Sequence, residues 1–154
     1  MRLSAIISPY NLERLSGLPS VHFEGWYAEG SWTITGENRK YIPGTGAYSG
    51  IIPNNPFALS AGGWGAWEIA ARYSHVDLND LFTPGISTAV TNGVAGGEQN
   101  IYTAGLNWYV NRNVRFMINY LHGTVDKFNG SAKPLGADIG AHFDALATRV
   151  QVAF

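Results

Sequence analysis

Residues 142–154 read H-F-D-A-L-A-T-R-V-Q-V-A-F and close the sequence on an aromatic side chain. One set of alternate residues, counted back from the end, is largely apolar and comprises Phe154, Val152, Val150, Thr148 and Leu146. The interleaved set holds Gln151 and Arg149 among small alanines. Period-two alternation indicates a β-strand with two unlike faces. One apolar face and one polar, small-residue face are typical of a transmembrane barrel, whose apolar side contacts lipid and whose polar side faces the interior.

Four further stretches alternate in the same way, and they cover residues 21–35, 64–78, 100–110 and 114–125. In the last of them, Phe116 and Ile118 alternate with Arg115 and Met117. Each stretch has about the length of 9–11 residues with which a tilted strand crosses a bilayer. A soluble sandwich with one buried face would also alternate, so the pattern by itself leaves that fold open.

The composition fits a membrane β-protein and excludes several other classes. Only 14% of the 154 residues are charged and the formal net charge is −1, so no basic character suggests a nucleic-acid partner. There is no cysteine for a disulfide or thiolate metal site, and no run of 18 apolar residues that would form a membrane helix. The histidines lie in different segments without metal-ligand spacing and are His22, His75, His122 and His142. We therefore expect neither an enzyme nor a cofactor.

The connections between the predicted strands differ in length. Residues 111–113 form a tight turn, whereas 79–99 and 127–141 are long loops rich in Gly, Ser, Thr and Asn. Short turns on one side and long loops on the other are typical of outer-membrane barrels. If the chain ends on the periplasmic side, the two long loops are external. Segment 36–63 is then periplasmic, where it either folds over the barrel mouth or contains an irregular element.

Four stretches resemble the carboxyl-terminal portion of the phosphate-selective porin O/P family. They are W-Y-A-E-G-S-W-T-I-T-G-E-N-R-K-Y (26–41), G-G-W-G-A-W-E-I-A-A-R-Y-S-H-V-D-L-N-D (62–80), Y-T-A-G-L-N-W-Y-V-N-R-N-V-R-F-M-I-N-Y (102–120) and A-L-A-T-R-V-Q-V-A-F (145–154). The motifs occur in the family's order with similar spacing over residues 21–154. The resemblance implies a sixteen-stranded barrel in the outer membrane of a Gram-negative bacterium, usually a homotrimer, that passes anions such as phosphate or pyrophosphate. The last strand also resembles the signal read by the outer-membrane assembly machinery, carried here by Phe154, Val152, Val150 and Leu146.

The number of strands is too small for a closed barrel. The sequence predicts five strands, or six if residues 1–20 contain one rather than a loop or an incomplete strand. The smallest bacterial barrels have about eight, and an open edge in lipid leaves backbone groups unpaired. We therefore expect residues 1–154 to be the carboxyl-terminal part of one barrel domain, which alone neither closes nor conducts. A small eight-stranded barrel with a structural or adhesion role and a soluble β-sandwich binding module remain alternatives.

Several charged residues of the predicted strands fall on the face opposite the apolar side chains. Parity places five of them on the interior side as candidate pore-lining residues: Arg72, Arg115, Arg149, Glu29 and Glu68. An arginine fork suits phosphate oxygens because it is planar and always charged. The same charges could instead satisfy one another within the barrel wall. Arg39 and Lys40, in the long segment 36–63, are candidates for the periplasmic mouth.

Overall fold

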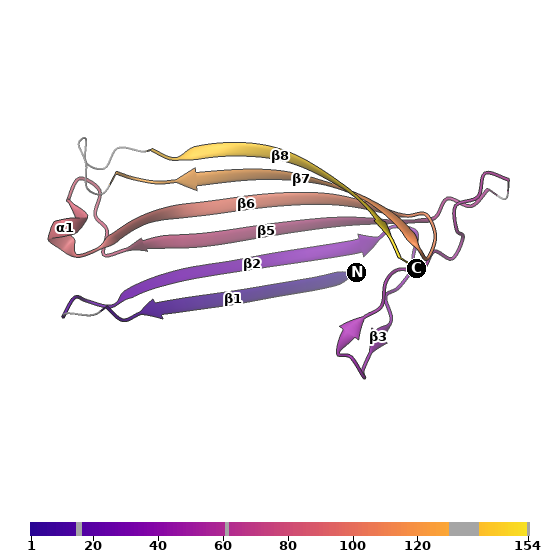
Figure 1. Ribbon diagram of the computed structural model, residues 1–154, viewed down its shortest axis with the longest axis horizontal. Helices are drawn as coiled ribbons and strands as arrows, with labels where there is room; N and C mark the ends of the chain where they lie inside the picture. Colours follow the sequence, from indigo (N-terminus) through magenta and orange to yellow (C-terminus); the bar gives the residue numbers. More distant parts are fainter. Residues whose placement is uncertain (15–16, 61, 130–138, 154) are drawn as a thin grey trace.

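Six long strands form one antiparallel sheet in the computed structural model, which describes residues 1–14, 17–60, 62–129 and 139–153. The strand order is β1-β2-β5-β6-β7-β8, and Figure 1 shows the strands running side by side. Their bounds are β1 Arg2–Leu12, β2 Val21–Thr33, β5 Ala66–Asp80, β6 Val94–Tyr109, β7 Val114–Asp126 and β8 Ala141–Val152. A small hairpin, β3 Tyr41–Ile42 with β4 Ala47–Tyr48, is inserted between β2 and β5. The predicted all-β antiparallel fold is confirmed.

Strand β1 is the main difference from the expectation for residues 1–20. Instead of a loop or an incomplete strand, eleven consecutive residues from Arg2 to Leu12 pair with β2. Leu3 and Ile7 alternate as a strand requires, but Ile6 puts an apolar side chain on the other face and hides the period. The sheet thus has six long strands, which is the larger of the two numbers that the sequence allows.

The loop between β5 and β6, at the end opposite the termini, is shorter than predicted. Strand β5 continues to Asp80 and β6 begins at Val94, so the predicted loop 79–99 shrinks to residues 81–93, which include the one-turn helix α1 Thr88–Thr91. A register shift between Asp77 and Asn79 accommodates an extra residue there and interrupts the alternation that sequence analysis depends on. Most of the predicted loop 127–141, residues 130–138, lies outside the described residues.

The apolar face of the sheet is continuous and uncovered. The register places one apolar row across four strands: Trp32, Ile69, Leu106 and Ile118. These side chains are 37–55% exposed, and the Trp67, Trp108 and Phe116 rings stack in the next row. Within the described residues no second sheet covers this face, which is contrary to a β-sandwich. In the same part of the chain, no helix has the length and apolar character needed to cross a membrane.

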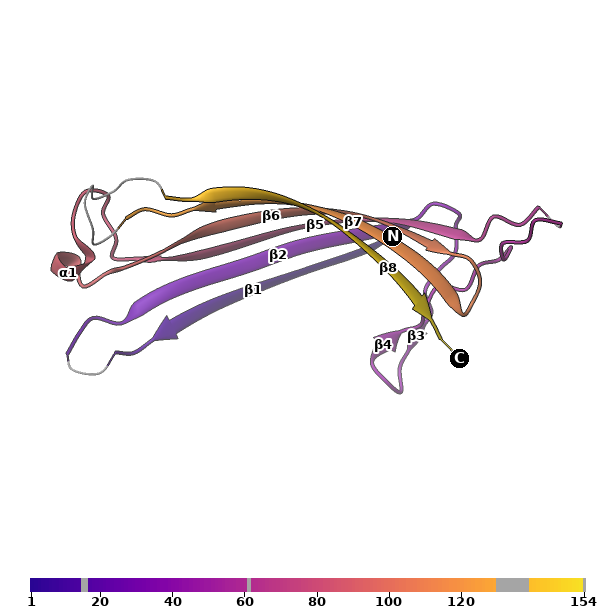
Figure 2. The same cartoon turned by 45° about the horizontal axis from the view of Figure 1, so that its top comes forward.

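Both chain ends lie at one end of the sheet, here called the terminal end (Figure 1). The segment 34–65 connects β2 to β5 there, and Figure 2 shows its β3–β4 hairpin standing off the sheet. Ile51 of this segment is buried against Ala66 and Tyr109, which belong to the polar face. Gly65 ends the segment with φ +71°, where an added Cβ would overlap the carbonyl oxygen of Tyr109.

The sheet is open among the described residues. Strands β1 and β8 each pair on one side only, with β2 and β7 respectively. Strands β3 and β4 have two residues each, too few to complete an eight-stranded barrel. Backbone N–H and C=O groups along both outer edges are therefore available to pair with further strands. In the hydrocarbon of a bilayer these groups need such partners.

Candidate functional site

The polar face carries all five charged residues that parity placed together. The register pairs Glu29 with Arg72 across β2 and β5. It also aligns Glu68 with Asn107, Met117 and Arg149 across β5, β6, β7 and β8. Arg115 lies one row nearer the terminal end, opposite Gln151. The structure thus gives these residues a common face, opposite the apolar row of Ile69.

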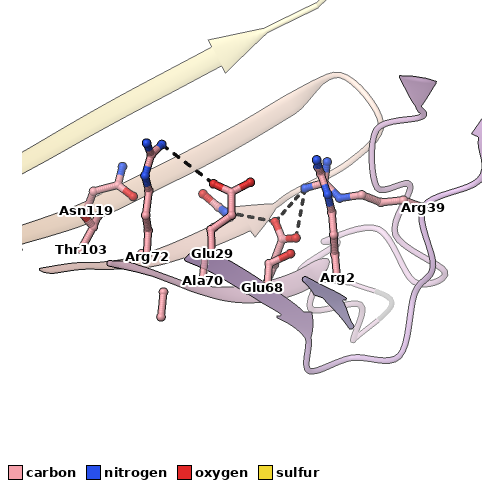
Figure 3. A pocket seen from close by; sticks show the side chains of 13 residues that line it. Arg2, Glu29, Arg39, Glu68, Ala70, Arg72, Thr103 and Asn119 are labelled. Atoms are coloured by element: carbon pink, nitrogen blue, oxygen red, sulfur yellow. Dashed lines mark hydrogen bonds and ion pairs between the residues drawn. The ribbon is translucent and has the colours of Figure 1, made fainter. Parts of the chain in front are cut away.

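A hollow opens in the middle of this face because the residues there are small. One row of the register runs across five strands and comprises Arg2, Ser31, Ala70, Gly105 and Asn119. Ser31, Ala70 and Gly105 form a low floor, while the longer side chains of Arg2 and Asn119 rise at its two sides. The hollow holds about 250 Å³. Figure 3 shows Arg72 on one side of Glu29, and Arg2 and Arg39 on the other.

The carboxylate of Glu68 anchors segment 34–65 to this face. Arg39 Nη2 donates to both carboxylate oxygens of Glu68, each at 3.0 Å. Tyr109 Oη donates to Glu68 Oε2 at 2.8 Å, and Asn107 Nδ2 donates to the same oxygen at 3.0 Å. The side chain of Glu68 is only 2% exposed, so this charge is buried but fully partnered.

The network continues towards the last strand through Tyr109. Its hydroxyl oxygen accepts hydrogen bonds from Arg39 Nη2 at 3.0 Å and from Arg115 Nη1 at 3.2 Å. Arg115 Nη2 donates to Gln151 Oε1 at 2.6 Å. Arg115 is thereby held by neutral partners on β6 and β8, and not by one of the predicted acidic residues.

A second buried carboxylate, Glu37, holds segment 34–65 together internally. The hydroxyl of Thr35 and the backbone N–H of Asn54 both donate to Glu37, the latter at 3.1 Å. Burial by itself would raise the pKa of Glu37, but these hydrogen bonds outweigh it and hold the pKa below its ordinary value of 4.5. Hydrogen bonds to Glu37 therefore hold the segment together internally, and hydrogen bonds to Glu68 hold it against the sheet.

Arg72 and Glu29 form a much looser pair. Arg72 Nη1 lies 4.0 Å from Glu29 Oε2, and the two side chains are 47% and 35% exposed. The guanidinium carbon of Arg72 lies 4.1 Å from the centre of the Tyr27 ring, a cation–π geometry that positions the group without neutralising it. Arg2 similarly lies over the Tyr48 ring, at 5.5 Å.

The remaining candidate residues are more isolated. Arg149 is exposed on the polar face of β8, and Lys40 is exposed beside the β3–β4 hairpin, where its backbone N–H donates to Ser49 Oγ. Of the predicted assembly signal, Leu146, Val150 and Val152 are exposed on the apolar face. The fourth member, Phe154, lies outside the described residues.

Several residues that line the hollow were not among the predicted site residues, and two of them, Arg2 and Asn119, carry its longer polar side chains. Asn119 alternates correctly with Ile118 and Tyr120, so its face was predictable, but nothing in the sequence placed it opposite Gly105. Arg2 was missed because β1 was not recognised. Among the described residues, no three His, Asp or Glu side chains are grouped as a metal site would require.

Comparisons with known proteins agree with these features. The family described as phosphate-selective porin O and P matches residues 6–154. The chain is 29% identical to Porin O of Pseudomonas aeruginosa over 131 residues, which cover 85% of this chain and 27% of that protein. It is 32% identical to an uncharacterized protein of Caulobacter vibrioides over 132 residues, which cover 86% of this chain and 23% of that protein. The chain thus spans about a quarter of the length of these two relatives.

Proposed function

Because this chain belongs to the phosphate-selective porin O and P family, we propose that residues 1–154 form the carboxyl-terminal wall of an outer-membrane diffusion channel for anions. Family membership implies a channel rather than an enzyme. Phosphate and pyrophosphate are the anions we propose, in keeping with the family's description. The whole channel would be a sixteen-stranded homotrimer in a Gram-negative outer membrane, inserted by the assembly machinery that reads the last strand.

The observation that carries this proposal is the division of one sheet into an apolar and a polar face. Exposed apolar side chains such as Trp32, Ile118 and Leu146 suit contact with lipid. Five arginines lie on or over the opposite face: Arg2, Arg39, Arg72, Arg115 and Arg149. An arginine facing lipid costs about 2–4 kcal/mol near the bilayer midplane. This face is therefore more stable against a water-filled interior than against lipid.

The two outer edges of the sheet support a position within a larger barrel. In an up-and-down barrel every strand pairs on both sides, because lipid offers no partner to a free N–H or C=O. Strands β1 and β8 run in opposite directions, so an even number of further antiparallel strands can join them. We infer that further strands close the wall between them.

Conductance of the whole porin in planar lipid bilayers tests the proposal. We expect discrete channels whose reversal potential in a potassium chloride gradient shows chloride to be the more permeant ion. Inorganic phosphate added to the chloride solution should reduce the current, because it occupies the same path. Cation selectivity, or the absence of discrete channels from correctly assembled protein, would contradict the proposed function.

A further inference from the structure

The hollow on the polar face combines free space with unused hydrogen-bond donors. Its floor of Ser31, Ala70 and Gly105 leaves about 250 Å³ open between the rows of Arg72 and Glu68. Gly105 keeps the floor low, since a Cβ at this position would lie 2.7 Å from Asn119 Oδ1 and would displace that side chain. The space is large enough for an oxyanion that keeps part of its hydration.

The charges around the hollow do not cancel. Glu68 is saturated by Arg39, Tyr109 and Asn107, so this carboxylate and Arg39 largely neutralise each other. Arg2 has no ion pair within the described residues and touches the aromatic ring of Tyr48 instead. Arg72 has only the loose contact with Glu29 at 4.0 Å, which is longer than a hydrogen bond. Positive charge therefore remains on both sides of the floor.

We propose that this hollow is a discrete oxyanion-binding site in which Arg72 and Arg2 hold an ion such as inorganic phosphate, and in which Glu29 competes with the ion for Arg72. The proposal deepens the proposed function and rests on it. Arg72 is already oriented by the Tyr27 ring, so its fork needs little rearrangement to engage two oxygens of a phosphate.

The competition explains how such a site can release its ion. A channel site has to bind strongly enough for the ion to enter and weakly enough for it to leave. When the hollow is empty, Glu29 is the nearest anion to Arg72. When phosphate enters, the guanidinium exchanges the long contact with Glu29 for hydrogen bonds to phosphate oxygens. The nearby Glu29 charge then repels the bound ion and limits its residence time. Arg39 cannot exchange in this way, because its partner Glu68 is buried.

Phosphate block of chloride current through the whole porin tests the site, with four single variants compared with the wild type. R72Q removes the guanidinium and should weaken the block about tenfold, since a lost charged hydrogen bond of about 1.5 kcal/mol corresponds to that factor. R72K keeps the charge but loses the fork and should weaken the block about threefold. E29Q removes the competitor and should strengthen the block about threefold. R112Q, in the turn between β6 and β7, is the matched control and should leave the block within twofold of the wild type.

The pattern of these four results decides the proposal. If R72K blocks like the wild type, the arginine acts only through its general field and the discrete site is overturned. If E29Q fails to strengthen the block, the competition is overturned. If the wild-type channel is not anion-selective, the proposed function fails instead. Heat-dependent gel mobility reports assembly of each variant, and R72K and E29Q continue the test if R72Q does not assemble.

Discussion

Replacement of Glu68 by Gln should detach segment 34–65 from the wall of the sheet. Three donors converge on the Glu68 carboxylate, from Arg39, Tyr109 and Asn107. A glutamine offers one acceptor oxygen and adds an NH₂ group that faces these donors. The substitution therefore leaves at least one donor without an acceptor and removes the charge that Arg39 binds.

The magnitude follows from the burial of the two partners. A hydrogen bond to a charged group contributes about 1.5–3 kcal/mol, and more than one is lost at the 2%-exposed Glu68. Arg39 is 26% exposed, so water replaces part of what this side chain loses. We therefore expect the segment to open about 2 kcal/mol more easily, which corresponds to about thirtyfold faster exchange of its protected amides.

Hydrogen–deuterium exchange of the whole porin, followed by mass spectrometry of peptides from residues 38–54, measures this opening. The range includes the backbone hydrogen bond from Ser49 N to Lys40 O, at 2.7 Å, which closes the β3–β4 hairpin. The matched control is E29Q, which removes the same charge from the same face but from a pair that is loose and exposed. Unchanged exchange in E68Q, or an equal increase in E29Q, would refute the anchoring role of Glu68.

Three further outcomes follow from the same structure. Because folding lowers the pKa of Glu37, its stabilisation is present above pH 4.5 and is lost as the pH falls through the lower folded value. Protection of the amides of residues 34–54, expressed relative to their intrinsic exchange rate at each pH, should fall in that window, and this step should be absent in E37Q. I118R places a charge against lipid and should cost about 2–4 kcal/mol and impair assembly, whereas its neighbour M117R faces the interior and should assemble, as heat-dependent gel mobility would show. G65A should lower the urea midpoint of unfolding more than G85A, since both positions have positive φ but only at Gly65 does the Cβ meet backbone.

The two faces of the sheet were predictable because strand geometry has a period of two. Once Ile69 and Tyr73 are assigned to the apolar face, Arg72 falls on the other, and the register confirms that placement. The failure at β1 has the same origin, because Ile6 sits on the polar face and breaks the pattern in a short stretch. The β5–β6 loop was predicted too long because the irregularity after Asp77 disrupts alternation before the pairing ends.

The Arg39–Glu68 contact could not be read from the sequence. The two residues are separated by 28 others, and most of those belong to a segment without periodicity, so no pattern links them. The sequence allowed two interpretations of the charged face. The charges either line a pore or satisfy one another within the wall. The structure shows Glu68 saturated by its partners, as the second interpretation expects, whereas Glu29 and Arg72 are exposed and only loosely paired, and their role in a pore lining stays a prediction.

The difference between the buried, fully bonded Glu68 and the exposed Glu29 arises from segment 34–65, and not from the residue types. Glu29 and Glu68 are chemically alike, lie on the same face and each face an arginine. Segment 34–65 covers Glu68 and brings Arg39 to it, which turns that carboxylate into an anchor. Glu29 lies beyond the cover, where water screens its contact with Arg72 and an entering anion can replace it. In the proposed site, the edge of the segment is thus the boundary on this wall between charges that maintain the structure and charges that would act on an ion.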